Sequence, residues 1–502
     1  MSDAKPGGQR ARDLILRFES ERDPFKYQIK GYSIWPLYRF MVWEHIKINL
    51  DGLTSRQPTG HSGVSRRLRA ARVMVEELWG LRKLKTARRE YEIVLLTTTN
   101  RLRDKTDGTY KNVYFDYCQP LLRNALQIFV DSRSDRKPAT QPSVYVSSIT
   151  VLPKIVLGGS GVRDGEERLS SLYSELTSFL ESAGCAEHMR MALSVWRREL
   201  DLFVARFDSF VEIFEATKPK VVVTDCHYDK MWAIAAAKRL RIPVLELQHG
   251  IVYDGHMAYT YDPRSASPYR DQIPLPDKYL AFGPYFSEIL MDRGFWSGSQ
   301  VENVGFPRME SHQSTFEYCQ PKTGEDLRVL ISSQWIMTEK LCKFLEATVG
   351  QLPKNITLSI KPHPLERDTG AYRKIDGLGV LDGGEEFYEL LAKHHVHCSV
   401  FSTTLLESVG LGVPTIILGL PGSENALPMS ERGHCKVVNS PGELAAVLAR
   451  VAGNATELAE WHRNTIKDRS YFWEPNASAN FQALLDEIVG PAAQSAEAGR
   501  EP

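Results

Sequence analysis

Predicted strands and helices alternate along both halves of the chain, and this order limits the fold more than any other feature. Helical patterns, for example at 230–240, separate short β-branched or apolar runs that predict strands. Parallel strands need crossover connections of this kind. The sequence therefore predicts an α/β protein with two doubly wound domains. The strands are expected at 91–99, 126–131, 143–148, 219–225, 242–250 and 278–283, then at 327–333, 356–364, 396–402 and 414–419.

The length of 502 residues is too great for one ordinary core, and a polar stretch at 310–326 separates the two halves. We expect a helical N-terminal extension over 1–90, a first Rossmann-like domain over 91–310 and a second over 326–490. Two long helices are expected within 165–216. Residues 100–112 read as a polar loop, and 152–159 as a short apolar connection.

Composition excludes several classes of protein. Lys plus Arg and Asp plus Glu both number 62, so no overall basic charge favours nucleic-acid binding. The 7 cysteines are scattered and form no CxxC pair, which argues against a disulfide framework and against structural zinc. The first residues lack the apolar core of a signal peptide, and no apolar run has the length of a membrane span. We expect a cytoplasmic protein, or one that lies on the inner face of the plasma membrane.

The stretch 65–90 is helical in pattern and basic at both ends. It fits an amphipathic helix on an anionic membrane surface. It also fits a solvated helix that packs on the protein, and charge runs more often have that role. We favour the packed helix, with its contacts made through Val73, Leu78, Trp79 and Leu81.

Three polar side chains lie at the carboxyl ends of predicted strands, the sheet edge where doubly wound folds bind ligands: His249, His363 and Ser402. Ser402, Thr403 and Thr404 precede or open a helix, and Glu407 lies one turn further on. Free N–H groups and hydroxyls there can bind an anion, although the same pattern is also an ordinary capping box.

In Lys361-Pro362-His363-Pro364 the two prolines end the strand and fix the direction of the imidazole. A fixed imidazole with a lysine nearby suits a phosphate. Of these two side chains, His363 is the better candidate for a phosphate contact, because alternate residues of a strand face opposite sides and Lys361 can point away.

The first half offers candidates for a general base. His249 ends a strand, and an imidazole titrates near neutral pH. Asp225 ends the preceding strand, and the two strands are expected to be neighbours. His227 and Asp229 lie in the same loop as Asp225 and are weaker candidates.

Common cofactor motifs are missing from the sequence. It contains no GxxxxGK[ST], no GxGxxG after a strand, no HExxH and no DxD. The run His394-His395-Val396-His397 reads as a helix end that enters a strand, so we do not expect it to bind metal. We expect metal-independent chemistry without a bound cofactor.

The motifs of residues 215–450, in their order, resemble GT-B glycosyltransferases of bacterial surface polysaccharides. The likeness extends to Kdo and sialic acid capsule transferases, to CDP-glycerol glycerophosphotransferases and, more distantly, to UDP-GlcNAc 2-epimerases. It is carried by 221–250, "KYLAFGPYFSEIL", "VENVGFPR", "SIKPHP" and "FSTTLLESVGLGVPTI". The glutamate expected in an epimerase is replaced by Gln248-His249.

The resemblance implies roles for these residues. His363 and the run Ser402–Thr404 would contact the donor phosphate, and Glu407 would bind the ribose hydroxyls. His249 would face the acceptor. Polysialyl-type transferases carry their base in an acidic-acidic-Gly motif, of which Asp254-Gly255 is only a loose echo, so the base stays open between Asp225, His249 and Asp254.

The expected activity is that of an inverting glycosyltransferase. It would move a sugar from a CMP-, CDP- or UDP-linked donor to a polysaccharide or a lipid-linked acceptor. A CDP-polyol phosphotransferase and a non-catalytic GT-B binding subunit are the alternatives.

Overall fold

The computed structural model gives an account of most of the chain. The residues that it describes are 7–52, 64–87, 89–98, 102–106, 109–130, 139–157, 163–185, 187, 191–322, 324–364, 366, 369–381, 384–467 and 469–491. All structural statements below concern these residues.

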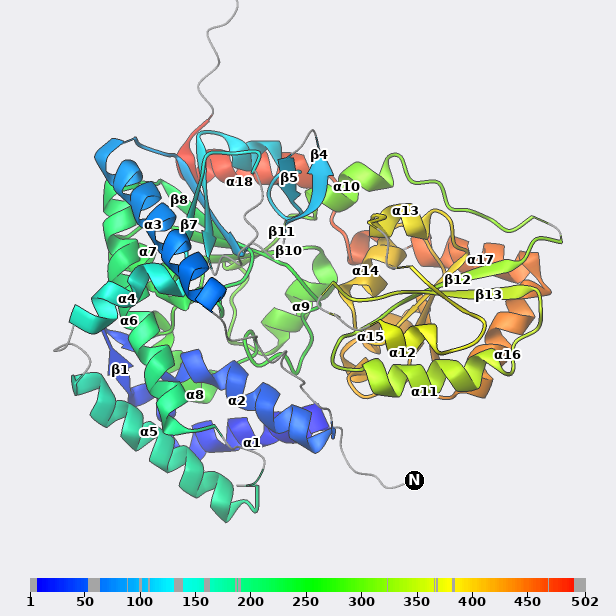
Figure 1. Ribbon diagram of the computed structural model, residues 1–502, viewed down its shortest axis with the longest axis horizontal. Coiled ribbons are helices and arrows are strands. Elements are labelled where there is room, and N and C mark those ends of the chain that lie inside the picture. Colours follow the sequence, from blue (N-terminus) through cyan, green and yellow to red (C-terminus); the bar gives the residue numbers. More distant parts are fainter. Residues whose placement is uncertain are drawn as a thin grey trace, which may run out of the picture.

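The first domain is built on a seven-stranded parallel sheet (Figure 1). Its strands carry apolar and β-branched residues, and the central ones are inaccessible to solvent because helices cover both faces. In spatial order they are β11 (Val301–Asn303), β10 (Lys278–Ala281), β9 (Val244–Leu247), β8 (Val221–Thr224), β3 (Ile93–Thr98), β6 (Ala125–Val130) and β7 (Ser143–Val146).

The second domain is built on a six-stranded parallel sheet. Both sheets have the Rossmann strand order, in which the chain moves outward from the first strand and then returns to its other side. The expected GT-B class of two doubly wound Rossmann-like domains is confirmed. In spatial order the strands are β14 (Leu378–Val380), β13 (Ile356–Lys361), β12 (Leu327–Ser332), β15 (Val396–Ser399), β16 (Thr415–Leu418) and β17 (Cys435–Val438).

Helices connect the strands and cover the sheets. In the first part of the chain they are α1 (Gly7–Arg22), α2 (Trp35–Leu50), α3 (Val64–Ala87), α4 (Ser148–Leu157), α5 (Arg163–Ser182), α6 (Leu193–Thr217), α7 (Met231–Arg239), α8 (Pro263–Ala266) and α9 (Pro284–Asp292). In the second part they are α10 (Pro307–Gln313), α11 (Thr338–Val349), α12 (Gly370–Arg373), α13 (Phe387–Leu391), α14 (Thr403–Gly410), α15 (Pro428–Glu431), α16 (Pro441–Ala452), α17 (Ala455–Lys467) and α18 (Ala477–Val489).

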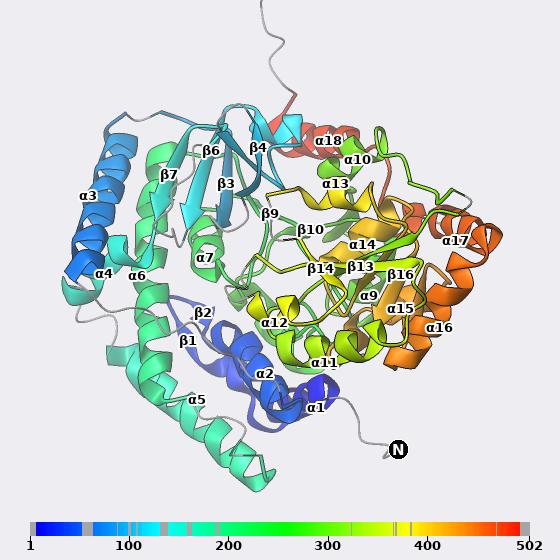
Figure 2. The same ribbon diagram turned by 45° about the vertical axis from the view of Figure 1, so that its right-hand side comes forward.

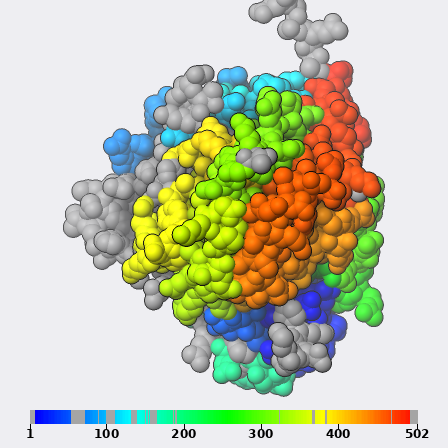
Figure 3. Space-filling view, turned by 90° about the vertical axis from the view of Figure 1, so that its right-hand side faces the viewer, coloured from blue at the N-terminus to red at the C-terminus, as the bar shows by residue number. Residues whose placement is uncertain are grey.

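Each end of the chain contacts the domain that it does not belong to by sequence. Helix α18 belongs to the predicted range 326–490, yet it lies on the first domain, where Arg123 donates a hydrogen bond to the carbonyl of Gly490 at 2.9 Å (Figure 1). At the other end, Lys340 of α11 donates to the carbonyl of Asp51, just after α2, at 3.0 Å. In Figure 3 the blue atoms of the N-terminal helices accordingly lie beneath the second domain.

Two segments that the sequence predicts as irregular contain regular secondary structure. The predicted loop 100–112 contains an antiparallel hairpin of β4 (Leu102–Thr106) and β5 (Thr109–Asn112). The sequence does carry a hairpin signal, because Asp107-Gly108 separates the two runs. The predicted connection 152–159 overlaps α4, whose short apolar run reads equally well as a helix or a connection. A further short pair, β1 (Gln28–Ile29) and β2 (Tyr32–Ser33), joins α1 to α2.

The packing predicted for the basic helix α3 is wrong for two of its residues. Leu78 and Trp79 are 41% and 60% exposed, whereas Leu81 is buried as expected. The buried face carries Glu77, whose carboxylate accepts hydrogen bonds from the backbone N–H of Ser147 at 3.1 Å and from its hydroxyl at 2.7 Å. That position is the N-terminus of α4, where a negative charge is stabilised. Docking of Glu77 therefore turns Leu78 and Trp79 away from the core.

Candidate functional site

The carboxyl ends of β12 and β15 form the switch point of the second sheet, where the strand order reverses. Here Ser332 ends β12, and its hydroxyl lies 2.7 Å from the hydroxyl of Thr404 at the start of α14. The next residue, Ser333, accepts a hydrogen bond from the backbone N–H of His363 at 2.8 Å. The pair Ser332-Ser333 thus connects the His363 loop with the Ser402–Thr404 helix start. Sequence reading missed this pair, although it forms the end of the predicted strand 327–333.

A carboxylate organises the loop that carries His363. Glu366 accepts hydrogen bonds from the backbone N–H of His363 at 2.8 Å, from Thr338 at 2.5 Å and from Tyr372 at 2.7 Å. It also accepts from Ser333. The four donors fix the loop after β13. The backbone position of His363 is therefore set by Glu366 as well as by the two prolines.

Lys361 lies beside this loop but is engaged elsewhere. Its ammonium donates to the carbonyl of Glu385 at 2.8 Å. Burial lowers the pKa of Lys361, an effect that the nearby Glu386 and Glu385 oppose. The structure therefore holds Lys361 against the segment before α13 rather than against Ser402–Thr404.

The start of α14 has the geometry of a capped helix. Ser402 is the N-cap, and its hydroxyl oxygen accepts a hydrogen bond from the backbone N–H of Thr404 at 3.3 Å. Because the oxygen acts as acceptor in this bond, the Ser402 O–H can donate to a ligand in front of the helix. The N-cap and an anion site are thus compatible at this helix, since the cap uses one N–H of the first turn. A capping box is not formed, because the third residue after the Ser402 cap is Leu405 rather than a glutamate.

A buried histidine supports the helix start from below. His397 is inaccessible to solvent and contacts Ser408 through Nδ1 at 2.8 Å and Ser332 through Nε2 at 2.7 Å. Ser408 donates its own proton to the carbonyl of Thr404, so it accepts from Nδ1–H of a neutral ring. Ser332 then donates to Nε2 and accepts from the hydroxyl of Thr404. This chain of bonds fixes Thr404, and the sequence reading had placed His397 only as a strand residue.

Acidification is expected to destabilise the second domain through two buried histidines. Desolvation lowers the pKa of His397 to about 3 and that of His395 to about 4. Both histidines bind protons more tightly when the chain is unfolded. Their contribution to the free energy of unfolding is therefore complete above about pH 6.5 and is lost as the pH falls toward 4. We expect each to remove about 1.4 kcal/mol of unfolding free energy per pH unit in that window.

Urea denaturation at pH 7, 6 and 5 measures this slope, with His397→Asn as the variant. The slope of the unfolding free energy against pH measures how many protons the chain takes up on unfolding. His397→Asn should lower this number by about one at the acidic end, whatever its effect on stability at pH 7. An unchanged slope in His397→Asn would show that His397 is not neutral and buried in the folded protein.

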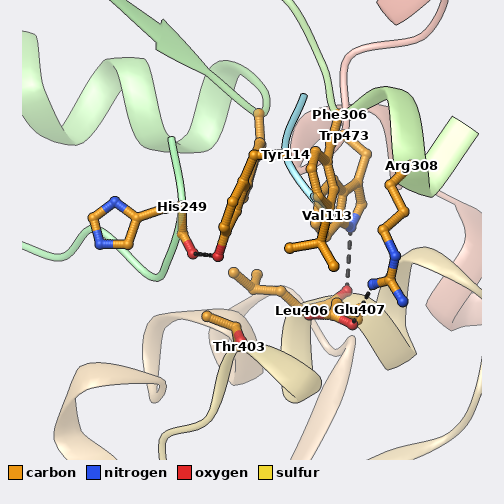
Figure 4. A pocket seen from close by; sticks show the side chains of 10 residues that line it. Val113, Tyr114, His249, Phe306, Arg308, Thr403, Leu406, Glu407 and Trp473 are labelled. Atoms are coloured by element: carbon orange, nitrogen blue, oxygen red, sulfur yellow. Dashed lines mark hydrogen bonds and ion pairs between the residues drawn. The ribbon is translucent and has the colours of Figure 1, made fainter. Parts of the chain in front are cut away.

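On the first domain, the backbone of His249 and Gly250, after β9, lies opposite the start of α14. A Cβ added to the next residue, Gly250, would lie 3.7 Å from Cγ2 of Thr403, so the two segments approach each other closely enough for a side chain there to touch Thr403. The backbone carbonyl of His249 accepts a hydrogen bond from the Tyr114 hydroxyl at 2.9 Å. In Figure 4 the His249 imidazole points away from this contact, toward the interior of the first domain.

The His249 imidazole lies between two phenols. Nε2 is 3.3 Å from the Tyr228 hydroxyl, and Nδ1 is 3.5 Å from the Tyr259 hydroxyl. Tyr259 donates its proton to the buried Glu246 at 2.7 Å, so toward His249 it can only accept. This arrangement favours the tautomer with a proton on Nδ1 and a lone pair on Nε2. Glu246 is held in turn by Nδ1 of His227 at 2.7 Å.

Asp225 and Asp254 occupy different surroundings. Asp225 has no exposed surface, accepts a hydrogen bond from Thr97 at 2.6 Å and pairs with the buried Lys230 at 2.9 Å. Asp254 is about half exposed and pairs with Arg12 of α1 at 3.0 Å and with Arg293 after α9. Both carboxylates are therefore paired with cations.

A narrow pocket between the domains joins the two sides of the site (Figure 4). Thr403, Leu406 and Glu407 of α14 form one wall. The buried Arg308, at the start of α10, stands 3.8 Å from Glu407 and also pairs with Glu386. The remaining lining residues come from the first domain and from the C-terminal segment: Val113, Tyr114, His249, Phe282, Phe306 and Trp473.

Trp473 joins the domains at this pocket. It stacks on Phe282 of the first domain with centroids 4.9 Å apart, and its indole N–H donates to the carbonyl of Leu406 at 3.2 Å. A Cβ at Gly410 would come within 2.5 Å of the indole nitrogen, so only glycine leaves room for this side chain. The described residues contain no group of three or more His, Cys, Asp or Glu side chains able to hold a metal ion. None of the described helices is long and apolar enough to cross a bilayer.

Comparisons with known proteins give structural neighbours only. No family model and no curated protein matches the sequence. A UDP-N-acetylglucosamine 2-epimerase from Listeria monocytogenes is 11% identical, with a TM-score of 0.49, 79% of this chain covered and 96% of the other. The glycotransferase of kitacinnamycin is 14% identical, with a TM-score of 0.48 and coverages of 80% and 100%. The wall teichoic acid polymerase TagF, in a structure with CDPG, is 11% identical, with a TM-score of 0.47 and coverages of 85% and 98%. At these levels of similarity the strand order itself, rather than any neighbour, defines the fold.

Proposed function

We propose that the protein is a metal-independent, inverting glycosyltransferase that uses a nucleotide-activated sugar. The observation that carries the proposal is the approach of the strand-end segment His249-Gly250 to the helix start at Thr403 across one interdomain pocket. Such a crevice at the carboxyl ends of parallel strands is where doubly wound folds bind nucleotides.

The donor phosphate binds in front of α14. The Ser402 hydroxyl, the N–H groups of the first turn and the imidazole of His363 supply donors, and Glu407 at the pocket wall binds the ribose hydroxyls. The connections through Ser332-Ser333 support this grouping, because they link the two loops to one strand end. Fixed donors of this kind stabilise the charge that develops on the leaving phosphate.

The acceptor binds on the first domain, on the side toward which the His249 imidazole points, and His249 acts as general base. Nε2 takes the proton from the acceptor hydroxyl as its oxygen bonds to the anomeric carbon. The bond from that carbon to the phosphate oxygen breaks, and its electron pair leaves with the nucleotide. His249 is preferred over Asp225, which is buried and paired with Lys230, and over Asp254, which is paired with two arginines. The acceptor is a growing surface polysaccharide, such as a capsule, or a glycolipid at the inner face of the plasma membrane.

Nucleotide binding is the first test. CMP, CDP, UMP, UDP, GDP and ADP are each added to the purified protein in a thermal-shift assay. A ligand present at 100 times its Kd should add about 2.7 kcal/mol to the unfolding free energy. We expect one pyrimidine nucleotide to stabilise the wild type and to lose its effect in His363→Ala. His45→Ala, which changes a histidine of α2, is the matched control and should respond like the wild type.

The outcomes separate the alternatives. Stabilisation by none of the nucleotides would favour a non-catalytic binding subunit over the proposed enzyme. Release of CMP together with a new phosphodiester from a CDP-activated polyol would identify a polyol phosphotransferase instead.

A further inference from the structure

The side of α3 that faces away from the protein carries apolar residues that folding does not explain. Val75 is 63% exposed, Trp79 60% and Leu78 41%, and Leu152 of the adjoining α4 is 46% exposed. We call these four residues the α3 apolar patch. They are four of the seven large apolar side chains that stand out as exposed in the described part of the chain, so the apolar exposure is concentrated there.

The helix has apolar residues on two opposite sides. Glu77, Leu81 and Leu84 recur at spacings of four and three, and they form the buried side. Val75 and Trp79 lie close to the opposite side, because each residue advances the helix by about 100°. Packing on the protein therefore accounts for one side only, and the patch must serve another contact or none.

Basic residues surround the patch. Lys83 places its ammonium 3.5 Å from the ring centroid of Trp79. The acidic groups facing this surface are already paired, because Glu76 bonds Arg72 at 2.8 Å, and Glu212 bonds Lys85 at 2.5 Å and Lys154 at 2.6 Å. Arg82, which lines the groove between α3 and α4, adds a further positive charge. The surface thus combines exposed apolar side chains with a net positive charge around them.

We propose that the α3 apolar patch docks on an anionic lipid surface. Apolar side chains, among them a tryptophan, enter the interface while cations contact acidic headgroups, and this is the chemistry of helices that lie in the plane of a membrane. In Figure 2 helix α3 forms the left-hand edge of the molecule, with α4 at its lower end, so a flat surface can approach the protein on this side. A protein partner that matched these basic residues would need a strongly acidic groove. A lipid surface needs only acidic headgroups, and we therefore favour a bilayer.

The choice of an inner-leaflet surface rests on the proposed function, because a transferase acting on a lipid-linked acceptor works there. The docking itself does not depend on catalysis. The experiment below uses neither nucleotide nor acceptor. Its failure would therefore leave the glycosyltransferase proposal standing, and failure of the nucleotide-binding test would leave the membrane-docking proposal standing.

Co-sedimentation of the full chain with vesicles tests the docking. Vesicles of phosphatidylcholine containing 30% phosphatidylglycerol are compared with pure phosphatidylcholine, at low salt and at 0.5 M NaCl. We expect binding to the anionic vesicles only, weakened at high salt because the charges are screened. The double variants Leu78→Glu/Trp79→Glu and Leu78→Ser/Trp79→Ser should lower the partition coefficient roughly tenfold or more. The serine variant separates loss of apolar contact from added charge.

A matched double variant controls for the two added charges. Val195→Glu/Met291→Glu changes two exposed apolar residues outside the patch, at 42% and 36% exposure, and should bind vesicles like the wild type. No binding of the wild type to anionic vesicles, or equal binding by the serine variant, would overturn the proposal. A wild-type dimer that the serine variant converts to a monomer would overturn it too, by showing that a second copy covers the patch.

Discussion

His249→Ala is expected to lower the rate of sugar transfer by about 10²–10⁴-fold, the contribution of a positioned general base, with nucleotide binding close to that of the wild type. The physical reason is the tautomer that Tyr259 and Glu246 favour, in which Nε2, 3.3 Å from the Tyr228 hydroxyl, is the proton-accepting nitrogen. Initial rates are measured with the donor whose nucleotide stabilises the protein, and its Kd is measured in parallel.

Three further variants identify the base. Tyr259→Phe should give a smaller loss and alter the acid limb of the pH–rate profile, because it removes the acceptor of the Nδ1 proton. Asp254→Asn should stay near the wild-type rate, since Asp254 pairs with Arg12 and Arg293. Asp225→Asn should act on stability, because it breaks a buried pair with Lys230. A rate for His249→Ala near the wild type, with a large loss in Asp254→Asn, would move the base to Asp254.

Arg39→Met is expected to destabilise the protein by about 3–5 kcal/mol, the usual cost of breaking a buried ion pair from one side. Glu19 of α1 and Arg39 of α2 are both at most 1% exposed, and their Oε1 and Nε atoms are 2.5 Å apart. Trp35 also donates to Glu19 at 2.7 Å, and Arg39 donates to the carbonyl of Met257 in the first domain. Removing the guanidinium leaves a buried carboxylate with its charge uncompensated.

Urea denaturation of the single and double variants separates this charge effect from lost packing. Glu19→Leu/Arg39→Met should be more stable than Arg39→Met alone, because no charge remains buried. Lys343→Ala breaks the exposed pair with Glu339, whose side chains are 73% and 75% exposed, and should leave the denaturation midpoint unchanged. A double variant less stable than both single variants would mean that packing, not charge, dominates at this site.

The sequence by itself determined the two sheets and the places where ligand-binding residues could stand. β-Branched runs separated by helical patterns define parallel strands, and the residues after those strands must lie at one edge of each sheet. His249, His363 and Ser402 could be read in this way because their positions depend on local order along the chain. The buried side of α3 could not, since the docking of Glu77 on α4 decides it.

The tertiary structure decided which strand ends meet and which polar groups are already used. The approach of Gly250 to Thr403, the support of Thr404 by His397 through Ser332, and the hydrogen bond of Asp225 with Thr97 all join residues far apart in sequence. The return of Trp473 to close the pocket is of the same kind. Local pattern records the period of one segment, whereas the partner of a buried charge or a pocket wall depends on how whole domains pack. Hence the sequence predicted the candidates at each strand end, and only the fold brought His249, Thr403 and Glu407 to one pocket.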